Sequence, residues 1–237
     1  MMALSTFILL LIMPFMQGGN ETTFLKHADA INLDVPEPSD FCFDGSDSIF
    51  VVSDQGALYK TSVKTGKSRL LLEWGSDLEG ISLSGDTLRL VDERYRQVAV
   101  ISKKASRVDL FYELPYQGAR NSSYESIAYL ENTKQFVLVT EKDPCTFHLF
   151  DMQFKQAGKF SIKGINEVSS IICNNQWLYV LSDEERTIYR INDAHEISRK
   201  YKIAIWNPEG IAFDREGNCW VLSDDLARIY NLGKLND

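Results

Sequence analysis

Histidine, cysteine and basic residues are all scarce in this chain of 237 residues. Three histidines, and four cysteines without a Cys-x-x-Cys pair, disfavour a zinc site, so the cysteines are expected to be buried free thiols. Lysine and arginine number 25 against 33 acidic residues, which gives a net charge of −8. Because a protein that binds nucleic acid needs a basic face, this balance argues against nucleic acid as a partner.

Long apolar runs are also missing, except for residues 7–16 near the N-terminus. That run is short for a membrane-spanning helix, and the small and polar residues 17–20 after it suit cleavage. We therefore predict a signal peptide over residues 1–23, a periplasmic or secreted protein, and no membrane span in the mature chain. No Lys or Arg precedes the run, so an uncleaved N-terminal anchor is the alternative.

Helical periodicity is nearly absent, and short strands bounded by polar turns dominate instead. A short unit recurs five times, most clearly in residues 77–81, which read Asp-Leu-Glu-Gly-Ile. The equivalent residues of the five units are spaced by 40, 46, 44 and 40 positions. This first column consists of Ser39, Glu79, Glu125, Ser169 and Glu209. An apolar strand follows each unit and ends in an acid, giving a second column of Asp54, Glu93, Glu141, Asp183 and Asp224.

A period near 40 residues, built from short strands, is typical of propeller blades. Each repeat accommodates four strands, and residues 28–35 precede the first unit as an outer strand precedes each later one. The last repeat stops after its third strand, so the N-terminal strand can complete it and close the ring. We predict an all-β, five-bladed β-propeller over residues 24–237, as a single domain and a monomer.

The innermost strands of a propeller line its central channel, so both columns are expected to meet there. Converging carboxylates repel one another unless a cation or protons intervene. Oxygen ligands without His or Cys select calcium, with magnesium as the second choice. Glu79, Glu125 and Glu209 are the predicted metal ligands, the second column supplies outer acids, and Ser39 and Ser169 are channel-facing polar residues.

Several of these residues also allow a purely structural interpretation. An acid at the end of a strand can cap the following turn, and Asp54, Asp183 and Asp224 each follow a serine in that position. The glycines at 80 and 210 are expected to relieve crowding near the axis. Cations near the acidic mouth (Arg94, Arg120 and Lys142) are expected to form surface ion pairs. The four tryptophans, at 74, 177, 206 and 220, are expected to pack between blades.

The units at 37–41, 77–81 and 208–211, each followed by a strand ending in Ser-Asp or Asp-Glu, resemble the SdiA-regulated (YjiK-like) family. That resemblance implies an exported five-bladed propeller of the bacterial envelope with a calcium site, distantly similar to NHL-repeat propellers. This chain departs from the pattern at Glu125, which is followed by Ser126 in place of glycine.

Two functions are compatible with these features. The first is a calcium-binding module of the cell envelope that binds an unidentified small molecule or envelope protein. It is favoured because no Ser-His-acid arrangement, nucleophile elbow or phosphate loop is recognisable. The alternative is a metal-dependent hydrolase of an ester, lactone or phosphoester, in which a channel carboxylate acts as the base.

Overall fold

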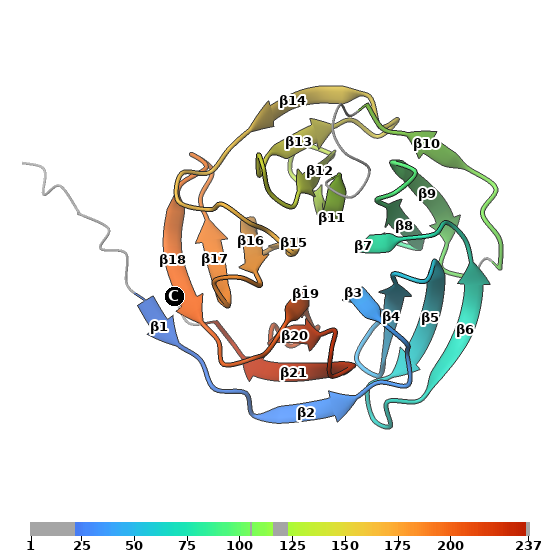
Figure 1. Cartoon of the computed structure of the whole chain (residues 1–237), viewed down its shortest axis with the longest axis horizontal. Coiled ribbons are helices and arrows are strands. Elements are labelled where there is room, and N and C mark those ends of the chain that lie inside the picture. Colours follow the sequence, from blue (N-terminus) through green and yellow to red (C-terminus); the bar gives the residue numbers. More distant parts are fainter. Residues whose placement is uncertain (1–21, 105, 116–122, 236–237) are drawn as a thin grey trace, which may run out of the picture.

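The computed structural model describes residues 22–104, 106–115 and 123–235 of the chain. This part folds into 21 strands and contains no helix, and hence none long and apolar enough to cross a membrane. The predicted signal peptide lies outside the described residues, apart from Thr22 and Thr23. Five antiparallel sheets are arranged in a ring around a central opening (Figure 1). The prediction of an all-β, five-bladed propeller is confirmed.

In blades 1 to 3 the strands follow one another in sequence order from the inner to the outer strand. Blade 1 consists of β3 (Pro38–Phe43), β4 (Ser48–Ser53), β5 (Ala57–Ser62) and β6 (Ser68–Glu73). Blade 2 consists of β7 (Leu78–Ser84), β8 (Thr87–Asp92), β9 (Gln97–Ser102) and β10 (Phe111–Glu113). Blade 3 consists of β11 (Tyr124–Leu130), β12 (Gln135–Thr140), β13 (Phe147–Phe150) and β14 (Gln156–Phe160).

Blades 4 and 5 each recruit a strand from the N-terminal end of the described chain. Blade 4 consists of β15 (Ser170–Asn174), β16 (Trp177–Ser182), β17 (Thr187–Ile191), β18 (Ile197–Lys202) and the additional β1 (Thr22–Phe24). Blade 5 consists of β19 (Pro208–Phe213), β20 (Cys219–Ser223), β21 (Arg228–Gly233) and β2 (Asp29–Asn32).

The ring closes where β2 pairs antiparallel with β21, with Ile31 opposite Ile229. This is the closure that the sequence predicts. The parallel pairing of β1 with β18, with Thr23 opposite Tyr201, was not predicted. Backbone hydrogen bonds at the outer edge of a sheet impose no pattern on the side chains. The three residues of β1 therefore carry no sequence signal for this pairing.

The core lies between the blades, because both faces of each sheet pack against neighbours. The second strand of blade 1 is therefore apolar without alternation, and Ile49 to Val52 are all inaccessible to solvent. Of the tryptophans, Trp220 is buried, and Trp74 and Trp177 pack against inter-blade clusters. The prediction is wrong for Trp206, which is 59% exposed beside the guanidinium group of Arg186. All four cysteines are free; the prediction of buried thiols is confirmed for Cys42 and Cys219 but is wrong for Cys145 and Cys173, which are half-buried.

One residue from each inner strand closes the channel near its middle. We call this set the belt; it consists of Asp40, Gly80, Ser126, Ser170 and Gly210. Asp40 is 2% exposed and accepts hydrogen bonds from the Ile81 N–H at 3.1 Å and from Ser170 Oγ at 3.2 Å. Further bonds run from Ile171 N–H to Ser126 Oγ and from Ile211 N–H to Ser170 Oγ. These bonds join all five blades at the axis.

The two belt glycines are required by this close approach. A Cβ atom on Gly80 would lie 2.9 Å from the Cα atom of Ser126, and one on Gly210 would lie 3.0 Å from Asp40 Oδ1. Contacts this short demand a shift of the neighbouring blade. The prediction that these glycines relieve crowding near the axis is confirmed.

The closure by β2 predicts unequal effects of two N-terminal truncations, compared with a chain that starts at residue 22. A chain that starts at residue 36 loses β2 together with Leu33 and Val35, which are 7% and 4% exposed. We expect it to lose at least roughly 3 to 6 kcal/mol in urea unfolding, the usual cost of exposing two such side chains. A chain that starts at residue 26 loses the exposed β1 and the half-buried Leu25, and we expect it to lose much less stability. Equal losses would contradict the assignment of closure to β2.

Candidate functional site

A β-bulge at the start of the inner strand positions the first-column residue. In blade 2, Leu78 lies opposite Asp92 and Gly80 lies opposite Val91, so Glu79 is the extra residue. The same irregularity places Ser39, Glu125 and Glu209 in their blades. Ser169 immediately precedes β15 at the equivalent position. A bulge re-aims the side chain of its extra residue, here into the channel.

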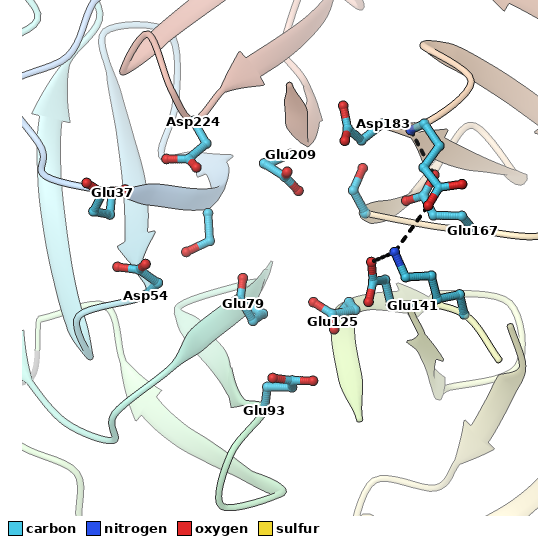
Figure 2. Close-up of a pocket in the computed structure, with 14 residues that line it drawn as sticks. Glu37, Asp54, Glu79, Glu93, Glu125, Glu141, Glu167, Asp183, Glu209 and Asp224 are labelled. Atoms are coloured by element: carbon cyan, nitrogen blue, oxygen red, sulfur yellow. Dashed lines mark hydrogen bonds and ion pairs between the residues drawn. The ribbon is translucent and has the colours of Figure 1, made fainter. Parts of the chain in front are cut away.

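The two predicted columns line one cavity of about 360 Å³ at this end of the channel. Figure 2 shows Glu79, Glu125 and Glu209 reaching toward its centre from different blades. Eleven of its fourteen lining residues are acidic. The lining consists of Glu37, Ser39, Asp54, Glu79, Glu93, Glu125, Glu141, Lys142, Glu167, Ser169, Asp183, Glu184, Glu209 and Asp224. All ten predicted site residues therefore lie around one cavity, which we call the acidic cavity.

The two first-column serines also fasten neighbouring blades together. Ser39 Oγ donates to the Leu78 carbonyl at 2.7 Å, and Ser169 Oγ donates to the Pro208 carbonyl at 2.9 Å. Their hydroxyl groups are thus engaged with the backbone of the next blade. The glutamates at the other three positions of the column remain the groups available to a ligand.

Next to the second column, the residue before each acid makes most of the side-chain hydrogen bonds to the neighbouring turns and loops. Ser53 Oγ donates to the Pro36 carbonyl at 2.7 Å, and Ser223 Oγ donates to the Trp206 carbonyl at 2.6 Å. Asp92 takes this role in blade 2, where it accepts from the N–H groups of Ser76 and Tyr95. Of the acids that follow, Glu93 accepts a hydrogen bond from the Ser123 N–H at 2.8 Å and Asp54 accepts one from the backbone of Gln55, but all five line the cavity.

A third acidic position, two residues before each first-column residue, was missed in the sequence. It holds Glu37, Asp77 and Glu167 in three of the blades. Glu167 is 5% exposed and accepts hydrogen bonds from Ser182 Oγ and from the Glu184 N–H. The fixed offset from the first column could have revealed this position, but Ser123 and Asn207 occupy it in the other two blades.

Positive charge is sparse around this cavity. Lys142 is the one basic residue among the described lining residues, and its ammonium group lies 2.8 Å from Glu141 and 3.1 Å from Glu184. Arg94 lies 3.9 Å from Asp77. Both were predicted to form ion pairs, which is confirmed, whereas Arg120 lies outside the described residues. Most of the carboxylates here thus have no basic partner in the described structure.

Burial and mutual repulsion make the first-column glutamates weak acids. Desolvation raises the pKa of Glu79 well above its ordinary value, and the carboxylate of Asp77, in hydrogen-bonding contact, raises it further. Desolvation likewise raises the pKa of Glu125, with the charges of Glu79 and Glu93 adding to the effect. Two carboxyl groups in hydrogen-bonding contact share a proton, and their titration belongs to the pair as a whole.

The same causes extend to the blade 5 side of the cavity. Desolvation, with the charges of Asp183 and Asp224, raises the pKa of Glu209 to about 8. Desolvation and the charge of Glu37 raise the pKa of Asp224 to about 6. Burial within the belt raises the pKa of Asp40 to about 8. In the absence of a cation the cavity therefore retains protons at neutral pH.

The available ligand atoms suit a hard cation. The lining offers carboxylate and hydroxyl oxygens without thiol or imidazole. The Oδ1 atoms of Asp54 and Asp224 are buried and make no hydrogen bond within the described structure. No three or more His, Cys, Asp or Glu side chains of the described residues already form a metal-binding group. The oxygens are thus of the right kind but are not drawn together around one point.

Comparison with known proteins supports the fold and the family. The sequence model of the SdiA-regulated family matches residues 67–231. The crystal structure of glutaminyl cyclase from Myxococcus xanthus matches with a TM-score of 0.72, covering 91% of this chain and 99% of that chain. Its sequence identity is 13%, a level at which the likeness concerns the fold alone. No curated protein sequence matches the chain.

The raised pKa values predict that stability falls as pH rises. The folded state keeps protons on Glu209 and Asp40 up to about pH 8, whereas an unfolded chain releases them near pH 4. Stability is thus complete at acidic pH and is lost through this window. In EDTA we expect the melting temperature to decline from pH 5 to pH 8, by roughly 2 to 4 °C for each kcal/mol lost.

Acids with lowered pKa values do not mask this trend. Asp44 and Asp214 are stabilised by hydrogen-bonded partners and lose that contribution only below their ordinary pKa of 3.8. Burial lowers the pKa of His148, which adds stability as pH rises toward its ordinary value of 6.5, so the part of the range above that value isolates the acids with raised pKa values. A melting temperature that stays flat or rises over this range would show that the cavity carboxylates titrate normally.

Proposed function

Since the chain belongs to the SdiA-regulated family, we propose that its acidic cavity holds a divalent cation and that the loaded propeller acts as a binding module. The observation that carries this proposal is the eleven acidic residues lining a cavity with a single lysine. Such a concentration of carboxylates is costly unless protons or a cation offset it. A bound cation would offset the repulsion among these carboxylates.

Calcium is the preferred ion and magnesium the second choice. Calcium accepts six to eight oxygen ligands in irregular geometry, whereas magnesium demands a near-ideal octahedron and keeps several waters. Glu79, Glu125 and Glu209 reach farthest toward the centre (Figure 2). Asp54 and Asp224 supply oxygen atoms without hydrogen-bond partners on the adjoining wall. Because these groups do not yet converge, water would complete the ligand shell.

Cation binding and proton release would be coupled at this site. Burial and neighbouring carboxylates raise the pKa values of Glu79 and Glu125, and Glu209 has a pKa of about 8. A metal ligand must be deprotonated, so a bound cation displaces these protons. The affinity for calcium should therefore increase between pH 6 and pH 8.

A cation in the cavity would give this face of the protein a positive centre framed by acids. The ligand of the module would be a carboxylate- or phosphate-bearing small molecule, or an envelope protein presenting such a group. We also propose export to the periplasm or the cell exterior, because of the apolar run over residues 7–16.

The ion is tested by the melting temperature in EDTA and after addition of excess calcium. A ligand that binds the folded state alone at 100 times its Kd stabilises it by about 2.7 kcal/mol. We expect a clear rise with calcium and a smaller one with magnesium. In the double variant Glu79→Gln, Glu209→Gln, the calcium response should disappear and the melting temperature in EDTA at pH 8 should increase, because repulsion is relieved.

The matched control is Glu196→Gln, Glu216→Gln, which removes the same charge at two exposed positions. It should keep the full calcium response. An identical response in both double variants would move the ion away from the acidic cavity. The absence of any calcium or magnesium response in the unmodified protein would refute the cation proposal.

The metal-dependent hydrolase is the second candidate, favoured by the pKa of Glu209 near 8, which suits a general base. Binding remains the preferred function, since an anionic phosphoester would meet strong repulsion at an acidic mouth. We expect p-nitrophenyl acetate and bis(p-nitrophenyl) phosphate to be hydrolysed no faster with calcium-loaded protein than with calcium alone. Turnover that is lost in Glu209→Gln would instead establish the hydrolase.

A further inference from the structure

The channel has a second cavity, of about 670 Å³, beyond the belt. It is lined by the later parts of the same inner strands, residues 41–43, 81–85, 127–133, 171–173 and 211–213. In every blade a single belt residue separates a residue of the acidic cavity from a residue of this one, as Gly80 separates Glu79 from Ile81. We call it the apolar cavity.

Its inner end is a ring of apolar side chains, one from each blade. The ring consists of Phe41, Ile81, Ile127, Ile171 and Ile211, each no more than 4% exposed. Half-buried Phe43, Leu83, Tyr129 and Phe213 continue the wall outward. Polar residues such as Ser82, Asn132 and Thr133 complete the wall, so this concave site combines an apolar inner end with a polar outer part, as small-molecule pockets do.

The charged groups of the apolar cavity are all negative. Glu131 and Asp193 are its charged lining residues in the described structure, and both are exposed at the rim. The negative charges of these two residues act on Cys173 in the cavity wall. Burial raises the pKa of the Cys173 thiol, and the charges of Glu131 and Asp193 raise it further. Arg89 and Lys134 each lie 6.0 Å from the ring of Tyr129, but neither lines the cavity.

The rim also carries the hairpin turn between β15 and β16, which holds two side-chain amides. Asn175 and Gln176 have φ angles of 48° and 70°, a region that suits Asn but is unfavourable for Gln. Positive φ at both central residues is the geometry of a two-residue type I′ hairpin turn, so the connection between β15 and β16 accounts for it. Both residues line the apolar cavity, where their amides can donate and accept hydrogen bonds at its entrance.

We propose that the apolar cavity binds a small organic amine. Its aromatic or branched apolar part would contact the ring of apolar side chains, and its ammonium group would lie at Glu131 and Asp193. The aromatic walls and rim carboxylates attract such a cation. A carboxylate- or phosphate-bearing ligand would meet two like charges and no basic lining group. This site does not depend on a cation in the acidic cavity.

The test uses three indole probes of similar body and different charge: tryptamine (cation), 3-methylindole (neutral) and indole-3-propionate (anion). Calorimetric titrations are performed with calcium-saturated protein. We expect saturable tryptamine binding with a Kd below about 1 mM, weaker binding of 3-methylindole, and no detectable binding of indole-3-propionate. Absence of tryptamine binding, or equal binding of the anion, would overturn the proposal.

Two variants locate the bound amine. Neutralising the rim by Glu131→Gln, Asp193→Asn should weaken tryptamine about tenfold and leave 3-methylindole unchanged. Filling the cavity by Cys173→Trp should abolish binding of both, with Leu83→Trp from another blade as the substitute if the first variant misfolds. The exposed pair Glu196→Gln, Glu216→Gln controls for net charge. Undiminished tryptamine binding in a folded cavity-filling variant would place the amine elsewhere and refute this site.

Discussion

The hydrogen bonds received by the buried carboxyl group of Asp40 set the geometry of the channel. Five inner strands converge at the axis, and each has one edge without a strand partner. Backbone groups buried there need other partners. Asp40 and two belt serines provide them for Ile81, Ile171 and Ile211. Because this joins the blades at one level, the residue before each belt position faces one cavity and the residue after it faces the other.

The acidic cavity results from a division of roles along each blade. A bulge directs the first-column residue into the channel, and a hydroxyl or Asp92 fixes the turn before the second-column acid. These local bonds hold carboxyl groups together although desolvation and repulsion oppose them. The stability lost there is offset by apolar packing between blades, which occupies both faces of every sheet.

The architecture was predictable because its signals are repeated and long-range. The period of the Glu-Gly-Ile units indicated the blades, and the incomplete last repeat indicated closure by β2. The bulges were not predictable. The spacing between repeats varies by several residues, so the one additional residue of a bulge cannot be recognised in it. Glu167 was missed because its position holds different residue types in other blades. Trp206 lies in the connection between β18 and β19, outside any strand, so the strand pattern carries no information about its exposure.

Closure by strands from opposite ends of the chain has a consequence for the order of folding. Ile31 pairs with Ile229, so the last blade cannot be completed until nearly the whole chain is available. Contacts this distant in sequence form slowly, because their loop-closure entropy is lost before they contribute. A chain emerging N-terminus first from a ribosome or an export channel would therefore present an unpaired β2, together with an incomplete last blade, until β21 emerges. During that interval the open ring would be most exposed to pairing with another chain.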